Sequence, residues 1–303
     1  MTGYLASPLV PAGWPSIVGI VNITEDSFSD GSRYLAAEDA LAHARQLRSA
    51  GADIIELGPA ASHPDAARVT DDSQRRRLAP VIEQLTAQNV PVSVDSFAPA
   101  IQRFAITQGV AYLNDIQGFP DPGLYEELAA ASCRLVVMHS VQRKGPATKV
   151  ATDPAVIWAG IDRFFAGRLA ALQSAGIGQD RLIIDPGLGY FLGSNPEPSL
   201  VTLAGIRRLK ARFGLPVLLS PSRKSFLRTL TGRGIAGAGP ASLAAELYAA
   251  CQGADYIRTH DVAALHDALT ILAAIAGQAA PCRAIESHLH ANPAPVRYAP
   301  RSQ

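Results

Sequence analysis

The sequence predicts an α/β fold, a (β/α)8 TIM barrel, on the strength of three observations. Eight short, mostly apolar runs rich in β-branched residues recur along the 303-residue chain. Longer stretches with apolar residues three and four positions apart separate these runs, as in amphipathic helices. Glycine follows several of these stretches at the position where helices commonly end. Apolar strands that alternate with helices are typical of parallel sheets, and eight such units favour a closed barrel over the alternative, an open doubly wound sheet.

The predicted elements divide the chain into a barrel with two extensions. The clearest helical patterns cover 37–51 and 240–253. We expect an N-terminal lead-in over 1–16, the barrel over 17–278, and a flexible C-terminal tail over 279–303, where periodicity is lost and proline becomes frequent. The predicted strands are 17–22, 53–58, 91–95, 111–115, 134–139, 181–185, 216–220 and 255–260.

Composition restricts the classes of partner. A formal net charge of +1 provides no basic field for nucleic acid or for an anionic membrane, so we expect small-molecule partners. Cys133, Cys251 and Cys282 are far apart in the sequence, which argues against both a disulfide framework and a zinc site. The N-terminal apolar stretch is interrupted by prolines and has no basic start, so neither a signal peptide nor a membrane span is predicted. A cytoplasmic location is the expectation.

Polar residues at the predicted strand ends indicate a ligand site, because active sites of such barrels lie where the strands finish. Arg258 and His260 are two residues apart and therefore share a strand face, which with Asn22 makes an anion site suited to diphosphate. Asn22 is also a candidate ligand for Mg²⁺. For each residue taken singly, a structural polar cap remains the alternative.

Two carboxylates and one carboxamide end three other predicted strands. Asp95, Asn114 and Asp185 suit a heterocycle with adjacent N–H donors, such as the edge of a pterin. A salt bridge from these carboxylates to Lys224 or Arg258 is the alternative. His139 is expected to be a hydrogen-bonded structural histidine rather than a catalytic base.

Ordered motifs along the chain resemble those of the dihydropteroate synthase family. They are GIVNITEDSFSDG from Gly19, SVDS from Ser93, YLNDIQGF from Tyr112, IIDPGLGY from Ile183, SRKSF from Ser222 and YIRTHDV from Tyr256. The resemblance implies a pterin-binding TIM barrel, a homodimer packed through its last helices and dependence on Mg²⁺. It also implies condensation of 6-hydroxymethyl-7,8-dihydropterin diphosphate with p-aminobenzoate.

The resemblance assigns roles position by position. Asp95, Asn114, Asp185 and Lys224 correspond to pterin-binding positions, and Asn22 to the position that contacts metal and diphosphate. Lys224, Arg258 and His260 are the candidate catalytic residues, the last two also binding diphosphate. The residues expected around p-aminobenzoate are Ser62, His63, Pro64, Tyr190, Phe191 and Ser222, of which Ser62 is also expected to contact diphosphate.

Two departures from the usual family sequence make the chain resemble the mobile sulfonamide-resistant dihydropteroate synthases. His63 stands where an arginine is usual, which replaces a permanent cation with a group that titrates near neutral pH. Phe191 adds bulk where the family more often has glycine. The hypothesis is that such walls collide with the ring that extends a sulfonamide beyond p-aminobenzoate. Alternative functions are a pterin-dependent methyltransferase and a non-catalytic pterin-binding protein.

Overall fold

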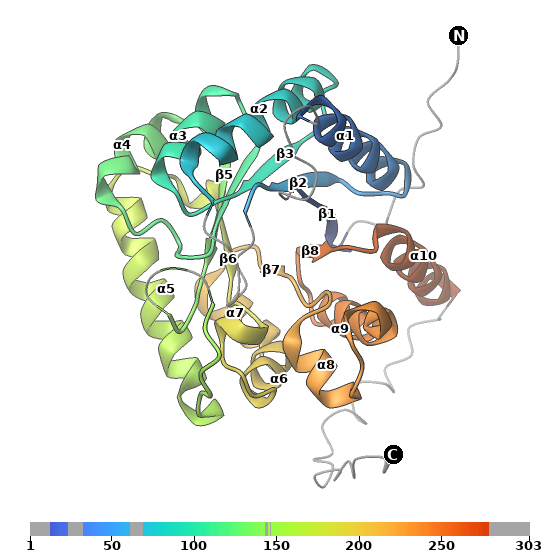
Figure 1. The fold of residues 1–303 in the computed structure, drawn as a ribbon. Helices are drawn as coiled ribbons and strands as arrows, with labels where there is room; N and C mark the ends of the chain where they lie inside the picture. The colour runs from blue at the N-terminus through green and yellow to red at the C-terminus, as the bar shows by residue number, and fades with distance from the viewer. Residues whose placement is uncertain (1–12, 24–32, 61–68, 143–144, 146, 279–303) are drawn as a thin grey trace, which may run out of the picture.

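Eight parallel strands form a ring at the centre of the molecule, and helices cover its outside (Figure 1). This computed structural model describes residues 13–23, 33–60, 69–142, 145 and 147–278. Residues 1–12 of the predicted lead-in and the predicted tail over 279–303 lie outside the described residues. The strands are β1 (Ser16–Asn22), β2 (Ile54–Gly58), β3 (Val92–Asp95), β4 (Tyr112–Asp115), β5 (Arg134–Met138), β6 (Leu182–Asp185), β7 (Leu218–Leu219) and β8 (Tyr256–Thr259).

The order of the strands confirms the predicted barrel. Strands β1 to β6 lie side by side in chain order, and β1 also pairs with β8, which pairs with β7. Between β6 and β7 the ring closes only through an isolated bridge of Ile184 with Val217. Because this bridge joins the two ends of the strand order, the sheet has no open edges and the doubly wound alternative is excluded.

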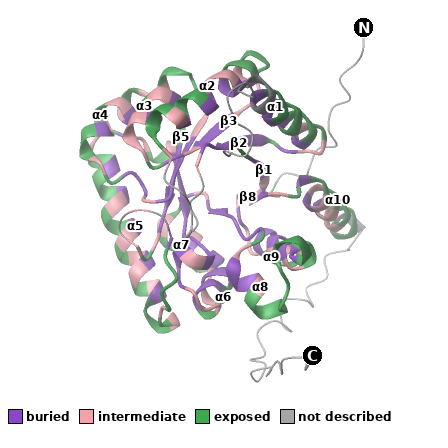
Figure 2. Ribbon diagram, viewed as in Figure 1, coloured by how far each residue is buried: buried purple, intermediate pink, exposed green. Residues whose placement is uncertain are grey.

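Helices pack their apolar sides on the ring and expose the opposite sides (Figure 2). In α2, Leu78, Ile82 and Leu85 follow the helical period and are fully buried. In the described part of the chain, no helix combines the length and apolar character needed to cross a membrane. The helices are α1 (Arg33–Ser49), α2 (Asp71–Ala87), α3 (Pro99–Thr107), α4 (Tyr125–Ala130), α5 (Ile157–Ser174), α6 (Glu197–Ala204), α7 (Ile206–Phe213), α8 (Ser225–Thr231), α9 (Gly239–Cys251) and α10 (Val262–Gln278).

Apolar side chains close the inside of the ring toward the strand N-termini. We call this cluster the barrel plug. It excludes water below the point at which the strands end, and the polar side chains further along the strands therefore face a partly dry space. Its buried members are Val18, Ile54, Val136, Ile183, Leu218 and Tyr256, with Tyr112 packed against them.

Candidate active site

Six of the predicted residues line one cavity at the carboxyl ends of the strands. They come from β3, β4, β6, the turn after β6, β8 and the N-cap of α8, so residues far apart in sequence share a single site. The site is placed where barrel enzymes carry their chemistry. The predicted members are Asp95, Asn114, Asp185, Phe191, Lys224 and Arg258, and the other lining residues are Ile116, Met138, Gly187, Leu188 and Ser220.

Strand periodicity explains why these side chains converge. Side chains two residues apart in a strand lie on the same face, so a residue two positions beyond a plug residue also points into the ring. Asn114 lies two positions beyond Tyr112, Asp185 two beyond Ile183. Arg258 follows Tyr256 in the same way. The apolar plug thus fixes which residue of each strand reaches the cavity.

Glu56 is a central residue of the site that the sequence reasoning missed. It lies in β2 two positions beyond the plug residue Ile54, and it is 1% exposed. Its carboxylate accepts hydrogen bonds from Ser93 Oγ at 2.9 Å and from Asn114 Nδ2 at 3.1 Å, and it forms an ion pair with Arg258 Nε. The signal was present in the sequence, because Glu56 is an acidic residue inside an otherwise apolar predicted strand.

Asn114 presents its carbonyl oxygen as an unused acceptor. Its Nδ2 donates to Glu56, which fixes the carboxamide orientation, and its Oδ1 is buried without a hydrogen-bond partner among the described residues. A buried polar atom without a partner costs free energy, on the order of 1–3 kcal/mol. Because Asn114 also lines the cavity, a ligand N–H is the natural partner for this oxygen.

Burial shifts the titration of the cavity carboxylates. Burial and the nearby Glu56 raise the pKa of Asp95 to about 7, although the Arg258 guanidinium opposes this shift. Burial raises the pKa of Asp185 to about 6, against a hydrogen bond that its Oδ1 accepts from Gly187 N at 2.8 Å. Perturbed carboxylates in a shared cavity are typical of functional sites.

Arg258 is held by acidic and hydroxyl groups from three other strand regions. Besides its pair with Glu56, its Nη2 donates to Asp95 Oδ2 at 3.1 Å and its Nη1 to Ser220 Oγ at 3.4 Å. The salt bridge between Asp95 and Arg258, which the sequence left as an alternative, is therefore present. It pairs two charges that are both largely buried.

Lys224 lies above the cavity beside an aromatic ring. Its Nζ is 4.9 Å from the ring centroid of Phe191, within the range of a cation–π contact. Burial and the Arg258 charge lower the pKa of Lys224 to about 8. Lys224 is the N-cap of α8 and follows Arg223, whose φ of 58° puts the chain in the left-handed region just before the helix begins.

Comparison with known proteins identifies the family. The model of the pterin binding enzyme family matches residues 18–260. Dihydropteroate synthase type-2 of Escherichia coli is 57% identical over 259 residues, 86% of this chain and 95% of that protein. Dihydropteroate synthase of Escherichia coli strain K12 is 34% identical over 261 residues, 86% of this chain and 91% of that protein. The chain belongs to the dihydropteroate synthase family.

Solved structures of the family support the same fold. A Xanthomonas albilineans dihydropteroate synthase with 4-aminobenzoic acid superposes with a TM-score of 0.79 at 39% identity, covering 88% of this chain and 94% of that one. A structure of the Xanthomonas albilineans enzyme in complex with 7,8-dihydropteroate has a TM-score of 0.75 at 37% identity, covering 90% and 97%. This chain is thus a transferase of the dihydropteroate synthase type.

The remaining predicted residues of this dihydropteroate synthase lie around the cavity or outside the described part. Asn22 is exposed at the end of β1, beside Gly58. Ser222 is buried, and its Oγ lies 3.0 Å from His260 Nδ1. Tyr190 packs against the cluster that contains Phe191. Ser62, His63 and Pro64 lie within 61–68, outside the described residues.

Two histidines of the dihydropteroate synthase are neutral near pH 7. Burial and the neighbouring Arg258, Arg223 and Lys224 charges lower the pKa of His260 to about 3, so its side chain supplies no positive charge beside Arg258. Its Nδ1 contacts Ser222 Oγ. His139 is 4% exposed and its Nδ1 lies 3.0 Å from Pro186 O, which fits the hydrogen-bonded structural role predicted for it.

Proposed function

We propose that the cavity holds the pterin ring of 6-hydroxymethyl-7,8-dihydropterin diphosphate while the amine of p-aminobenzoate displaces diphosphate and gives 7,8-dihydropteroate. The observation that carries this proposal is the buried Oδ1 of Asn114, which has no partner among the described residues and lies in a cavity with two carboxylates. Three acceptors in one dry site match a ring edge with several N–H donors. The relatives bear the name of the same synthase.

The cavity carboxylates orient the ring and favour positive charge on it. Asp185 accepts pterin N–H donors through the oxygen that Gly187 does not use. Asp95 gives up part of its ion pair with Arg258 and accepts a hydrogen bond from the pterin instead. As diphosphate leaves, positive charge develops on the pterin, and preorganised carboxylates stabilise it without reorganising.

The diphosphate lies at the mouth, near the end of β1 and the end of β8. Its negative charge favours protonation of His260, whose pKa is held low in the free protein by neighbouring cations. The exposed carboxamide oxygen of Asn22 suits Mg²⁺, which prefers oxygen ligands and retains several waters. The described residues contain no cluster of three His, Cys, Asp or Glu side chains that would hold a metal without substrate. Mg²⁺ bound with the diphosphate would neutralise charge on the leaving group.

Phe191 is the residue we assign to discrimination against sulfonamides. Its ring is 6% exposed, lines the cavity and lies against Lys224, so it limits the space beside the p-aminobenzoate position. Replacing Phe191 with Gly is expected to lower the inhibition constant for sulfamethoxazole at least tenfold, which corresponds to about 1.4 kcal/mol of relieved repulsion. Phe191→Leu retains most of the bulk and serves as the control. If Phe191→Gly is inhibited by sulfamethoxazole as weakly as wild type and still turns over p-aminobenzoate, Phe191 does not discriminate against sulfonamides.

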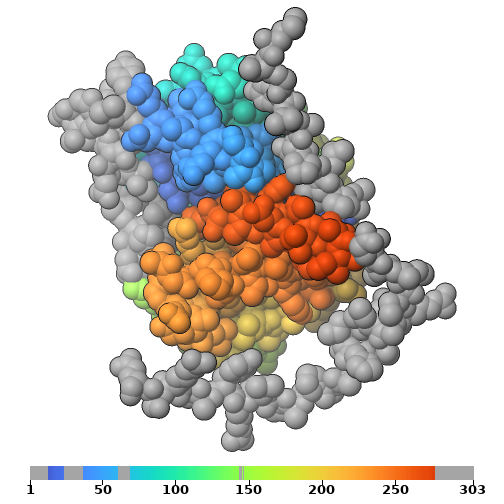
Figure 3. All heavy atoms as spheres, turned by 90° about the vertical axis from the view of Figure 1, so that its right-hand side faces the viewer, coloured from blue at the N-terminus to red at the C-terminus, as the bar shows by residue number. Residues whose placement is uncertain are grey.

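A homodimer through the last helices is the assembly we favour. The helices α8, α9 and α10 form one continuous face (Figure 3, orange to red). These helices and the turn between α8 and α9 carry exposed apolar side chains that a second copy of the chain would cover. They are Leu230, Ile235, Tyr248, Ile271 and Ile275, each between 45% and 62% exposed.

A reducing compartment such as the cytoplasm is the location we favour for this enzyme. Cys133 and Cys251 are both free thiols. Cys133 is buried, whereas Cys251 is exposed at the end of α9, where an oxidising environment would promote pairing between molecules.

One assay separates the synthase from its two alternatives. Purified protein is mixed with 6-hydroxymethyl-7,8-dihydropterin diphosphate and Mg²⁺, with and without p-aminobenzoate, and released diphosphate is measured. Release that requires the amine supports the synthase. A methyltransferase or a silent pterin-binding protein releases none, and that result would overturn the proposal.

A further inference from the structure

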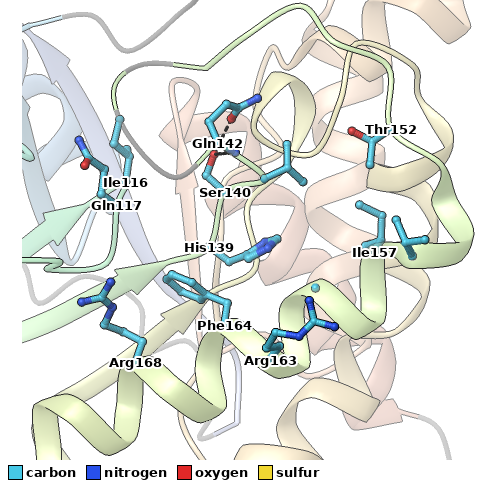
Figure 4. A pocket seen from close by; sticks show the side chains of 13 residues that line it. Ile116, Gln117, His139, Ser140, Gln142, Thr152, Ile157, Arg163, Phe164 and Arg168 are labelled. Atoms are coloured by element: carbon cyan, nitrogen blue, oxygen red, sulfur yellow. Dashed lines mark hydrogen bonds between the residues drawn. The ribbon is translucent and has the colours of Figure 1, made fainter.

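A second cavity lies beside the active site, between the loops after β4 and β5 and helix α5 (Figure 4). We call it the α5 cavity. Its volume is about 450 Å³, which is within the range of small-molecule sites. Among the described residues, Ile116 alone lines both this cavity and the active site. The other lining residues are Gln117, His139, Ser140, Val141, Gln142, Thr152, Val156, Ile157, Gly160, Arg163, Phe164 and Arg168.

His139 offers the α5 cavity an unpaired acceptor. The side chain is 4% exposed, and its Nδ1 lies 3.0 Å from the carbonyl oxygen of Pro186, so Nδ1 carries the proton that makes this hydrogen bond. The other ring nitrogen, Nε2, has a lone pair and receives no hydrogen bond from a described residue. Burial lowers the pKa of His139 to about 4, so the ring is neutral at pH 7 and Nε2 accepts rather than donates.

The charges around the α5 cavity are positive. Arg163 and Arg168 line it, and no acidic side chain is among its lining residues. Arg168 Nη1 already donates to Phe119 O at 2.7 Å and to Tyr125 Oη at 3.1 Å. Arg163 forms no ion pair with another described residue, and Figure 4 shows its guanidinium group below the His139 ring. An anionic group on a ligand would therefore pair with Arg163.

A glycine keeps the space next to His139 open. Gly160 lies inside α5, where glycine is the least favourable residue after proline. A Cβ at this position would meet only His139 Nε2, at 3.9 Å, so the fold itself tolerates a side chain there. The absent side chain leaves room beside the unused lone pair. Gly167 lies in the same helix, and a Cβ there would meet nothing within 4 Å.

We propose that the α5 cavity is a second binding site, for a small aromatic carboxylate that carries a hydroxyl or amino group. The carboxylate pairs with Arg163, and the hydroxyl or amino group donates to His139 Nε2. The ring lies against Phe164 and Ile157, which supply the apolar part of the wall. His139 directly follows β5, and Ile116 lines both cavities, so this ligand lies beside the pterin cavity.

Isothermal titration with 4-hydroxybenzoate, in the absence of pterin, tests the proposal. The variants are Gly160→Leu, which fills the space beside His139, and Gly167→Leu, a matched change on the same helix outside the cavity. Wild type and Gly167→Leu are expected to bind the probe equally, and Gly160→Leu at least tenfold more weakly. 4-Methylbenzoate lacks the donor and 4-hydroxybenzamide lacks the charge, so both are expected to bind wild type at least tenfold more weakly.

Synthase activity distinguishes a lost site from a misfolded protein, because Gly160 does not line the active site. Gly160→Leu is expected to retain turnover of its synthase substrates. If Gly160→Leu does not fold, Arg163→Gln, at an exposed position, tests the carboxylate contact instead. This variant is expected to bind 4-hydroxybenzoate at least tenfold more weakly than wild type. Absence of probe binding at millimolar concentration overturns the proposal. Equal binding by wild type and the variant used, Gly160→Leu or Arg163→Gln, also overturns it.

Discussion

Replacing Glu56 with Gln should weaken both the fold and the pterin site, because one carboxylate serves Ser93, Asn114 and Arg258 at the same time. Glutamine keeps the shape of the side chain and one acceptor oxygen, but it removes the charge and introduces an N–H₂ group. Arg258 would then retain Asp95 as its only acidic partner among the described residues. The Asn114 carboxamide would lose the carboxylate that fixes its orientation.

The expected loss of stability follows from the burial of the ion pair. Breaking a buried pair by removing one partner costs about 3–5 kcal/mol. Because Asp95 remains beside Arg258, we expect the lower end, about 3 kcal/mol. For a domain of this size that corresponds to a fall in Tm of about 6–12 °C. Release of the Asn114 carboxamide is also expected to weaken pterin binding at least tenfold, about 1.4 kcal/mol.

Thermal unfolding and titration with a non-reactive pterin measure the two effects separately. Glu83→Gln, at an exposed position of α2, is the matched control and is expected to leave both quantities unchanged. A melting temperature and a pterin affinity of Glu56→Gln that both equal those of wild type would refute the assigned role of Glu56.

Three further predictions concern the cavity and the assembly. Asp185 has a pKa raised to about 6 and is expected to bind pterin in its ionised form. The association constant for pterin should therefore fall about tenfold per pH unit below pH 6. A series of titrations at different pH values that shows no such fall contradicts this. Gly187→Ala should lower the free energy of unfolding in urea by about 1–3 kcal/mol, because the φ of Gly187 is +76° and an added Cβ would lie 2.4 Å from His139 O. An unchanged urea midpoint of unfolding argues against this. The pair Ile271→Glu and Ile275→Glu should give a monomer in sedimentation experiments, and a dimer that persists excludes this face.

The strands were predictable from sequence because barrel strands have a strong local signature. Each predicted run overlaps an observed strand, and all but one of the runs agree with the strand to within one residue at each end. The run predicted as 216–220 is the exception, since β7 contains only Leu218–Leu219. The pairing that defines a strand there depends on β6 and β8, and local sequence does not report it.

The convergence of the cavity residues was predictable in part. Asp95 and Asp185 end their strands and Asn114 is the last residue but one of β4, and strand ends meet at one mouth in a barrel. Glu56 was missed because it lies inside a strand, one layer below the ends. The engagement of Arg258 by two carboxylates and the neutrality of His260 depend on distances between distant segments, which the sequence does not contain.

The single bridge between β6 and β7 leaves a seam in the ring, with consequences for motion. Phe191 follows β6 and Lys224 follows β7, so the two side chains in cation–π contact lie on opposite sides of this seam. Few backbone hydrogen bonds between β6 and β7 must break for one of these strands to shift relative to the other. Amide exchange is therefore expected to be faster along β7 than along β1, and the width of the entrance between the two loops can adjust while the other strands stay in register.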